Sequence, residues 1–388
     1  MNLIKRTFAT LTTVLACASA SASPMVIPNA PTVAAGSYVL MDYNTGRILA
    51  ENNANEQRAP ASLTKLMTSY VLGQEVNSGN AALEDMVTVS EKAWAKNFPG
   101  SSVMWIEVGT QVKLEDLYRG MVIQSGNDAC VAIAEHIAGT ESAYTDLMNA
   151  WAAKLGMQST HFANSHGLDA SDQLTSAYDM ALLGQAIVRD IPEHYHLYSE
   201  REFTYNNIRQ HNRNGLLWDR SLNVDGLKTG YTSNAGYSLV SSATRGDMRL
   251  IAVVMGTKSP QAREAESKKL LNYGFRFFET VTPYKAGEEF VAEPLYYGNK
   301  PEVKLGVLED TPVTIYRGQA DQLKADFQLD QELKAPLYRG DRVGTLYFKL
   351  DGQDIATYPL TVLEDVEEGS WFSKLLDYLK LLFLSFFN

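Results

Sequence analysis

Apolar residues recur along this chain with two different periods, and the changes between them predict the order of its elements. Alternating, strand-like runs lie at both ends of one long region, over 37–42, 47–51, 223–231, 235–243 and 249–255. Helix-like runs fill the middle of that region and follow its last strand, over 63–71, 114–123, 128–138, 144–155, 178–188 and 262–273. Strands distant in sequence must then meet in one sheet. The pattern predicts an α+β domain over 23–282, with a helical layer packed on an antiparallel sheet.

Beyond Pro283 the pattern changes to short apolar runs separated by turn residues. These strand-like runs cover 289–292, 303–307, 313–316, 325–329, 345–350 and 355–362. The segment 283–366 is therefore predicted to be a small all-β domain. No repeat of fixed period is visible in the sequence.

The last segment, 367–388, predicts an amphipathic helix with a very wide apolar face. At 100° per residue, its polar residues gather in one arc of about 140°, and large apolar residues cover most of the rest. Lys374, Asp377 and Lys380 argue against a helix that crosses a bilayer. Two interpretations remain, a helix docked on its own domain and an anchor lying in the plane of a membrane surface. The terminal position and the acidic segment before the helix favour the anchor.

The first 22 residues have the pattern of a secretory signal peptide. Lys5 and Arg6 precede a run of small and apolar residues that is too short to span a membrane. Small-residue cleavage sites end at Ala20 and at Ala22. Cleavage at either site removes Cys17 and leaves Cys130 as the single cysteine, which cannot form an internal disulfide.

Composition narrows the possible functions. The chain has 388 residues, 45% of them hydrophobic, which is ordinary for a globular protein and long enough for two domains. With 34 basic and 45 acidic side chains the net charge is −11. This acidic balance argues against nucleic acid as a partner, because phosphate binding needs clustered Lys and Arg.

The first candidate for chemistry is Ser62-Leu63-Thr64-Lys65, which opens the predicted helix over 63–71. Ser62 and Lys65 share a face away from the apolar stripe. A serine hydroxyl is a poor nucleophile unless a base removes its proton, and a lysine one turn away can do so when it is neutral. By itself the spacing is a weak signal and favours the simpler interpretation, in which Ser62 caps the helix.

Two further motifs follow in the chain. Ser125-Gly126-Asn127 lies in a turn between two predicted helices, where Ser125 can pass a proton to a leaving group and Asn127 can hold a substrate amide. Alone, this motif is more often a plain helix connection.

Lys228-Thr229-Gly230 lies on a predicted strand. Lys228 and Thr229 can bind a carboxylate, and Gly230 lets a substrate backbone approach the strand. The backbone N–H groups of Ser62 and Tyr231 can together form an oxyanion hole. The alternative is an ordinary exposed strand with a glycine bulge.

The three motifs in this order, on a helix start, a helix turn and a late strand, match the penicillin-recognising serine hydrolases. The resemblance extends to 125–130, 164–169, 212–214 and 225–230. Over its whole length the chain is similar to the low-molecular-mass penicillin-binding proteins, in particular the D-alanyl-D-alanine carboxypeptidases of Gram-negative bacteria. Their fold is a β-lactamase-like peptidase domain followed by a β-rich domain and an amphipathic anchor helix.

The resemblance implies roles for individual residues. Ser62 would be the acylated nucleophile, Lys65 the general base and Ser125 part of the second catalytic motif. The remaining predicted residues would bind substrate: Asn127, Lys228, Thr229, Gly230, Tyr231, Arg213 and Arg263. Relatives often have His or Thr where this chain has Tyr231, so its pocket shape is expected to differ.

The resemblance also implies partners and a location. The expected substrate is a peptidoglycan pentapeptide stem ending in D-Ala-D-Ala, and β-lactam antibiotics are expected to acylate and inhibit the enzyme. No cofactor is predicted. The expected location is the periplasm, with the helix in 367–388 holding the enzyme on inner-membrane lipid at the outer face of that membrane. The partner of the β-domain is left open.

Two rival functions remain. A serine β-lactamase would use a glutamate in an E-x-x-x-N loop, and Glu202 and Asn206 have that spacing, but this segment is predicted to be a strand. A non-catalytic wall-binding scaffold would not need all three motifs. Metal catalysis is not predicted, because the histidines lack H-E-x-x-H spacing and His194 and His196 are expected on a solvated surface.

Overall fold

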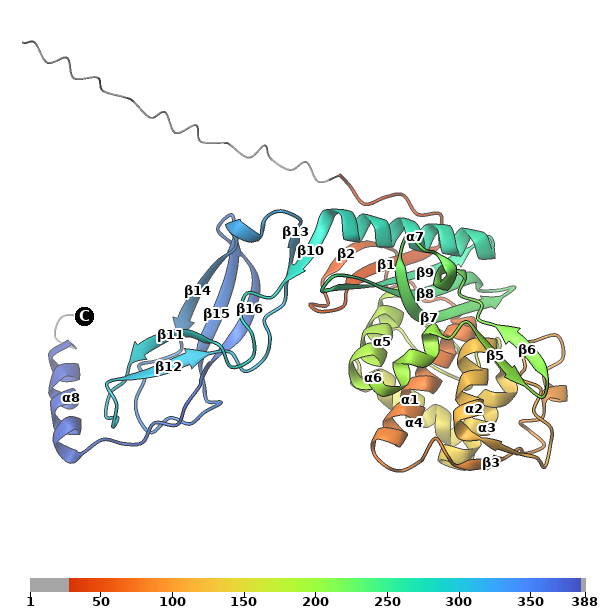
Figure 1. Cartoon of the computed structure of the whole chain (residues 1–388), viewed down its shortest axis with the longest axis horizontal. Coiled ribbons are helices and arrows are strands. Elements are labelled where there is room, and N and C mark those ends of the chain that lie inside the picture. Colours follow the sequence, from red (N-terminus) through yellow and green to blue (C-terminus); the bar gives the residue numbers. More distant parts are fainter. Residues whose placement is uncertain (1–27, 385–388) are drawn as a thin grey trace, which may run out of the picture. The chain divides into compact units, whose positions relative to one another are not determined.

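The computed structural model describes residues 28–384 of the chain (Figure 1). The predicted signal peptide and its cleavage sites lie outside this range, as do the last four residues of the predicted C-terminal helix.

One antiparallel sheet organises the first domain. Its strand order is β2-β1-β9-β8-β7, and every neighbouring pair is antiparallel. The strands are β1 (Ser37–Asp42), β2 (Ile48–Asn52), β7 (Asn223–Thr232), β8 (Gly236–Arg245) and β9 (Met248–Thr257). The β1–β2 hairpin thus joins the later strands of the sheet through the pairing of β1 with β9, as predicted. β7 carries the Lys228 motif and lies at the sheet edge.

Helices cover both faces of this sheet (Figure 1). Alternate residues of β1 enter different cores: Val39 packs with the main helical layer, whereas Leu40 packs with the long helix α7. This alternation follows from the two-residue period of a strand. The helices are α1 (Lys65–Asn77), α2 (Leu114–Arg119), α3 (Asn127–Ala138), α4 (Glu141–Lys154), α5 (Ala177–Asp190), α6 (Pro192–Tyr195) and α7 (Pro260–Phe277). Short hairpins add β3 (Met86–Thr88), β4 (Gln111–Lys113), β5 (Glu202–Tyr205) and β6 (Ile208–His211).

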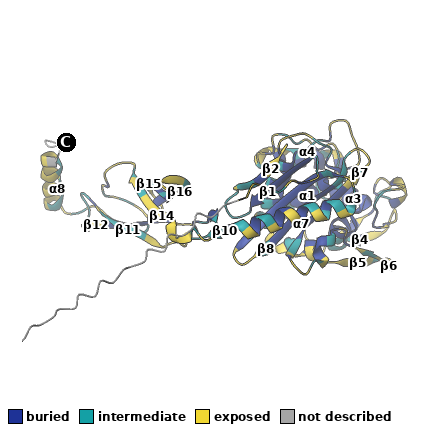
Figure 2. Cartoon of the chain, turned by 90° about the horizontal axis from the view of Figure 1, so that it is seen from above, coloured by how far each residue is buried: buried dark blue, intermediate teal, exposed yellow. Residues whose placement is uncertain are grey.

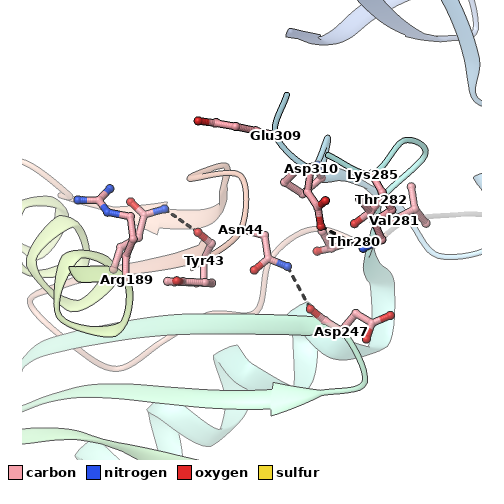
Figure 3. Close-up of a pocket in the computed structure, with 12 residues that line it drawn as sticks. Tyr43, Asn44, Arg189, Asp247, Thr280, Val281, Thr282, Lys285, Glu309 and Asp310 are labelled. Carbon is pink, nitrogen blue, oxygen red and sulfur yellow. Dashed lines mark hydrogen bonds and ion pairs between the residues drawn. The ribbon is translucent and has the colours of Figure 1, made fainter. Parts of the chain in front are cut away.

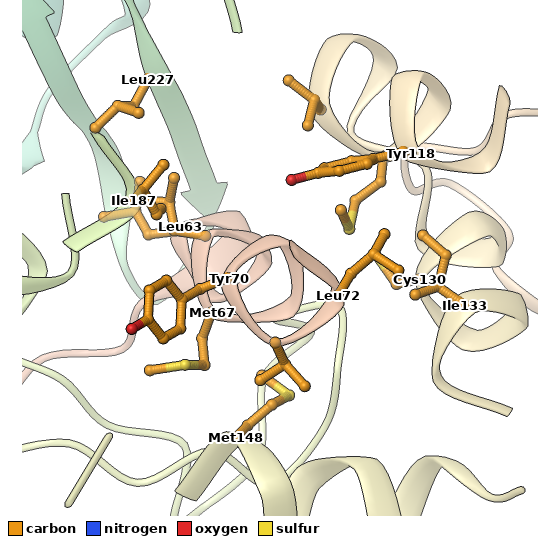
Figure 4. Packing of buried hydrophobic residues seen from close by; sticks show 14 of the residues in the cluster. Leu63, Met67, Tyr70, Leu72, Tyr118, Cys130, Ile133, Met148, Ile187 and Leu227 are labelled. Carbon is orange, nitrogen blue, oxygen red and sulfur yellow. The ribbon is translucent and has the colours of Figure 1, made fainter. Parts of the chain in front are cut away.

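Helix α1 lies inside the helical layer rather than on its surface. Figure 4 shows Leu63, Met67, Tyr70 and Leu72 pointing from this segment in different directions into the packed core. The predicted apolar stripe is buried, but so are the polar residues Thr68 and Ser69. The helix is therefore not amphipathic, and Lys65 at its start is buried as well.

The predicted helix over 114–123 changes character half-way. It begins as α2 and continues as a π-helix, Gly120–Gln124, which ends at Ser125 with φ of 64°. Such wide turns often occur at functional sites. One smaller expectation was wrong: His194 is buried with its ring 5.9 Å from that of Tyr118, whereas His196 is exposed.

The C-terminal domain is all-β, as predicted. Strand β10 (Phe278–Val281), which the sequence analysis missed, pairs with β13 (Val313–Tyr316). A five-stranded sheet follows in the order β11-β12-β16-β15-β14. Its strands are β11 (Glu289–Pro294), β12 (Glu302–Gly306), β14 (Lys324–Leu329), β15 (Arg342–Leu350) and β16 (Gln353–Val362).

The C-terminal helix, α8 (Trp371–Leu384), exposes its apolar face (Figure 2). Trp371 is 76% exposed, and Phe372, Tyr378 and Leu379 are each more than half exposed. Its polar side contacts the β-domain, where Asp377 accepts a hydrogen bond of 2.8 Å from the backbone N–H of Tyr297. A helix docked through its apolar face is therefore not what is observed. Within residues 28–384, no helix is long and apolar enough to span a membrane.

Candidate active site

The residues predicted from the three motifs converge on one cavity of about 400 Å³. It is lined by Ser62, Ser125, Asn127, Arg213, Thr229, Gly230, Tyr231 and Arg263. The side chains of Lys65 and Lys228 lie behind this lining and are 1% and 3% exposed. A larger cavity of about 890 Å³ near the turn after β1, drawn in Figure 3, contains none of these residues.

Ser62 lies on a tight 3-10 turn, Ala61–Thr64, which leads directly into α1. The helix itself begins at Lys65, so Ser62 makes no side-chain cap, and the capping interpretation is wrong. Gly230 explains how β7 approaches this turn: a Cβ there would lie 3.0 Å from the carbonyl oxygen of Pro60. The glycine of the third motif thus makes room for the chain's own serine turn.

The amine of Lys65 contacts three oxygen atoms, one of which belongs to Ser62. Nζ lies 3.3 Å from Ser62 Oγ and 2.7 Å from Asn127 Oδ1, and it also donates to the carbonyl oxygen of His166. Burial, the largest cause, and the positive charge of Arg213 together lower the pKa of Lys65 to about 8. A substantial fraction of this amine is therefore neutral near physiological pH.

The second motif is held by a loop that the sequence analysis did not single out. Asn127 Nδ2 donates to Ser101 Oγ at 2.8 Å, which fixes the orientation of the amide so that its oxygen faces Lys65. Arg213 donates to Ser102 Oγ at 2.5 Å. The strained residue of the motif is Ser125, in the left-handed region, and not Gly126. The Ser125 hydroxyl is buried and has no hydrogen-bond partner within the described chain.

Cations dominate the electrostatics of the cavity. Burial lowers the pKa of Lys228 well below its ordinary value, and the charges of Lys65, Arg213 and Arg263 add to this effect. Arg263 Nη2 donates to the carbonyl oxygen of Arg213 at 3.2 Å. Among the described residues, no Asp or Glu lines the cavity. Cations without a paired acid in the cavity favour an anionic ligand.

Comparison with known proteins identifies the family. Residues 25–259 match the sequence profile of the D-alanyl-D-alanine carboxypeptidases, and 278–368 match that of the C-terminal domain of penicillin-binding protein 5. The chain belongs to the D-alanyl-D-alanine carboxypeptidase family. Carboxypeptidases of this family act on the D-Ala-D-Ala ends of peptidoglycan stems and bind penicillins.

Individual family members are similar over nearly their full length. The carboxypeptidase DacA of Escherichia coli K12 is 53% identical over 367 residues, which are 94% of this chain and 91% of that protein. The crystal structures of penicillin-binding protein 5 from Haemophilus influenzae have a TM-score of 0.85 at 50% identity, covering 88% of this chain and 100% of theirs. For penicillin-binding protein 6B from Escherichia coli the TM-score is 0.74 at 44% identity, covering 87% and 97%.

Tyr231, the residue expected to change the shape of the pocket, lies at the rim of the cavity. Tyr231 is 51% exposed, and its ring stacks on that of Tyr237, its cross-strand partner, with centroids 4.2 Å apart. The guanidinium group of Arg263, on α7, lies 5.8 Å from the centroid of the Tyr237 ring. The segment that resembled a β-lactamase loop is β5, where Glu202 is exposed and ion-paired with Arg209.

Proposed function

We propose that Ser62 is the nucleophile of a serine D,D-carboxypeptidase and that Lys65 is its general base. The observation that carries this proposal is the hydrogen-bond geometry at Lys65 Nζ. Three oxygen atoms surround it, and two of them belong to carbonyl groups, Asn127 Oδ1 and His166 O, which can only accept.

The direction of the lone pair follows from this arrangement. A neutral amine has two N–H groups and one lone pair. The two carbonyl acceptors take both N–H groups, so the lone pair faces the third neighbour, Ser62 Oγ, 3.3 Å away. Lys65 is then oriented to receive the hydroxyl proton of Ser62 at the moment of attack.

In the proposed reaction, Ser62 Oγ attacks the carbonyl carbon between the two D-alanine residues while its proton passes to Lys65. The oxyanion that forms is held by the backbone N–H groups of Ser62 and Tyr231. The C–N bond then breaks, and the leaving amine takes a proton through the hydroxyl of Ser125. D-alanine departs and the shortened peptide remains as an ester of Ser62, which water hydrolyses to a carboxylate and the free serine.

The cationic groups supply substrate recognition in this proposal. The terminal carboxylate of the peptide binds Lys228 and Thr229, with Arg213 and Arg263 as further cations, because no acidic side chain of the described chain competes for them in the cavity. Asn127 holds the substrate amide. Stem peptides of peptidoglycan and β-lactams present such a carboxylate, whereas a neutral C-terminal amide does not.

We further propose that the enzyme works in the periplasm on the outer face of the inner membrane. The support is the exposed apolar face of α8 together with the signal-like first 22 residues. In this organisation the peptidase domain covers 23–282, the β-domain 283–366 and the anchor 367–388.

The decisive experiment incubates the purified protein with fluorescent penicillin and, separately, with a peptide ending in D-Ala-D-Ala. The wild type should become labelled at Ser62 and release D-alanine, and Ser62→Ala should do neither. Rapid release of the label, within milliseconds, would instead indicate a β-lactamase. A folded wild type that neither binds label nor releases D-alanine would indicate a non-catalytic scaffold.

A further inference from the structure

A carboxylate outside the three motifs holds the turn that touches Lys65. Glu141, in the first turn of α4, is 8% exposed. Its Oε1 accepts hydrogen bonds from the backbone N–H of Ser165 at 3.1 Å and from the hydroxyl of Ser165 at 2.7 Å. The next residue, His166, provides the carbonyl oxygen that accepts from Lys65 Nζ. A single peptide unit, 165–166, therefore lies between the residue that Glu141 binds and the carbonyl group that accepts from Lys65.

The imidazole of His166 also makes contacts that hold the turn in place. Its Nδ1 accepts from the backbone N–H of Leu168 at 3.2 Å, which places the ring proton on Nε2, facing Glu141 Oε1 at 3.5 Å. Burial, the largest cause, and the charge of Lys65 together lower the pKa of His166 to about 4, so the ring is neutral. With Nδ1 engaged by a backbone donor, the ring orients the turn and does not act as a base.

A second side chain fixes the other end of the same turn. Gln173 Oε1 accepts from the backbone N–H groups of Ala163 and Asn164 at 2.7 and 3.2 Å. Its Nε2 donates to Thr64 Oγ1 at 2.9 Å, on the turn that carries Ser62. The 163–167 turn is thus tied to α4 through Glu141 and to the nucleophile's own turn through Gln173.

We propose that Glu141 is a positioning residue for the acylation step: by holding Ser165, it keeps the His166 carbonyl on Lys65 and so directs the amine's lone pair at Ser62. The inference rests on the proposed role of Lys65 as general base. Within the described chain Glu141 makes no hydrogen bond to Lys65 or to Ser62, and it acts through the 165–166 peptide.

Glu141 acts on Lys65 by fixing the position of the 165–166 peptide, and not through its own negative charge. Oε2 of Glu141 forms an ion pair of 2.9 Å with Lys92, so the carboxylate is already compensated. Burial opposes its ionisation, but the hydrogen bonds from Lys92 and Ser165 outweigh burial and hold the pKa of Glu141 below its ordinary value. The charged or titratable groups that face Lys65 come from other elements: Cys130, Asp128, Arg213, Lys228 and His166.

The test compares Glu141→Ala, Glu141→Gln and Ser165→Ala by the rate of Ser62 labelling with fluorescent penicillin as a function of pH. Glu141→Ala frees the turn, and we expect the plateau rate to fall at least about tenfold, because small misplacements of a catalytic group are costly. The acid limb of the pH–rate profile of Glu141→Ala should also move to lower pH. The His166 carbonyl stabilises the ammonium form of Lys65, so loss of this acceptor lowers the pKa of Lys65.

The other variants separate position from charge. Glu141→Gln keeps an oxygen acceptor for Ser165 and should stay within about threefold of wild type. Ser165→Ala removes one of the two bonds and should lie between wild type and Glu141→Ala. The matched control is Glu115→Ala, which removes a carboxylate from the first turn of α2 that is ion-paired with Lys113 at 2.7 Å. It should leave rate and pH profile unchanged.

The outcomes are distinguishable from a failure of the proposed function. An unlabelled wild type would overturn the role of Ser62. A labelled wild type with an unchanged Glu141→Ala profile would overturn only the positioning role, as would a Glu141→Gln variant as slow as Glu141→Ala. If Glu141→Ala does not fold, as judged by circular dichroism, the decision falls to Ser165→Ala, and a profile identical to wild type would overturn the inference.

Discussion

The side-chain oxygen of Asn127 lies 2.7 Å from Nζ of Lys65, although the two residues are 62 positions apart in the chain. This contact joins the first motif to the second. The S-x-x-K spacing alone cannot indicate this contact. In the proposed mechanism it acts together with the contact to the His166 carbonyl to leave the lone pair of the amine facing Ser62. The acceptor is fixed in turn by Ser101, which binds the amide nitrogen of Asn127.

The first prediction concerns the pH dependence of acylation. A base works in its neutral form, and the neutral fraction of Lys65 grows as pH rises through its pKa of about 8. The rate of penicillin labelling should therefore rise with pH and reach half its maximum near that value. Lys65→Arg should lower the rate at least about a hundredfold at every pH below 10, because guanidinium stays protonated. Normal labelling of Lys65→Arg would remove Lys65 from the base role.

The second prediction concerns carboxylate recognition by Lys228, which is 3% exposed and donates only to the neighbouring carbonyl of Thr229 at 3.2 Å in the described chain. Lys228→Ala should cost ~2–4 kcal/mol of transition-state stabilisation on a substrate with a free carboxylate. A substrate amidated at its C-terminus should be little affected. Measuring kcat/KM on both substrates checks this, and equal losses on the two would contradict the carboxylate role.

The third prediction concerns Gly167, which has φ of +90° and packs on the serine turn. A Cβ at this position would lie 1.9 Å from the carbonyl oxygen of Ala61. Gly167→Ala should cost at least ~2 kcal/mol in unfolding free energy, from strain and from displacement of backbone, and should impair labelling. The control is Gly139→Ala, at φ of +76° with nothing within 4 Å. Gly139→Ala should lose only ~1 kcal/mol of unfolding free energy, measured by urea unfolding. It should be labelled by penicillin at the wild-type rate. Similar losses in both variants would exclude the backbone contact as the cause.

The fold was predictable from sequence wherever one local pattern decides the structure. The strand-like runs predicted over 235–243 and 249–255 correspond to β8 and β9, which pair as neighbours in the sheet. The three predicted motifs also come together at one cavity, since each has a fixed position on a helix start, a turn or a strand, and Arg263, which stands in no motif, lines the same cavity.

Residues that act through tertiary contacts were not predictable in this way. Ser101, Glu141 and Gln173 stand in no motif, and their partners lie 26, 24 and 109 positions away. Strand β10 follows α7 without a turn signal and is a strand because Val313–Tyr316 pairs with it. The burial of Lys65 likewise depends on helices packed on every side of α1, which a helical stripe cannot indicate.

The fourth prediction concerns Cys130, which is fully buried on α3 (Figure 4). Its Sγ lies 3.1 Å from the carbonyl oxygen of Gly126. Burial raises the pKa of this thiol to about 12, so it carries almost no thiolate and should react slowly with disulfide reagents until the protein unfolds. Cys130→Ser should remain active, since a hydroxyl can donate to the same carbonyl. Reagent bound to the wild-type thiol should inhibit by crowding the second motif. An inactive but folded Cys130→Ser would assign the thiol a chemical role.

The last prediction concerns the proposed role of α8 as a membrane anchor. Lys374 is ion-paired with Glu368, and Lys380 lies 3.6 Å from Asp377, so α8 carries little uncompensated positive charge. Attachment should therefore depend on burial of the exposed apolar face, at ~1.5–3 kcal/mol for each large side chain fully buried, and not on anionic lipid. Leu379→Glu should release the protein from membranes, whereas Lys380→Gln, with the same change in net charge on the polar side, should not. Truncation after Glu368 should give a soluble protein that still binds penicillin. Fractionation decides the matter: wild-type protein should stay with membranes in high salt and leave them in detergent, and release by salt alone would mean that electrostatic attraction holds the helix.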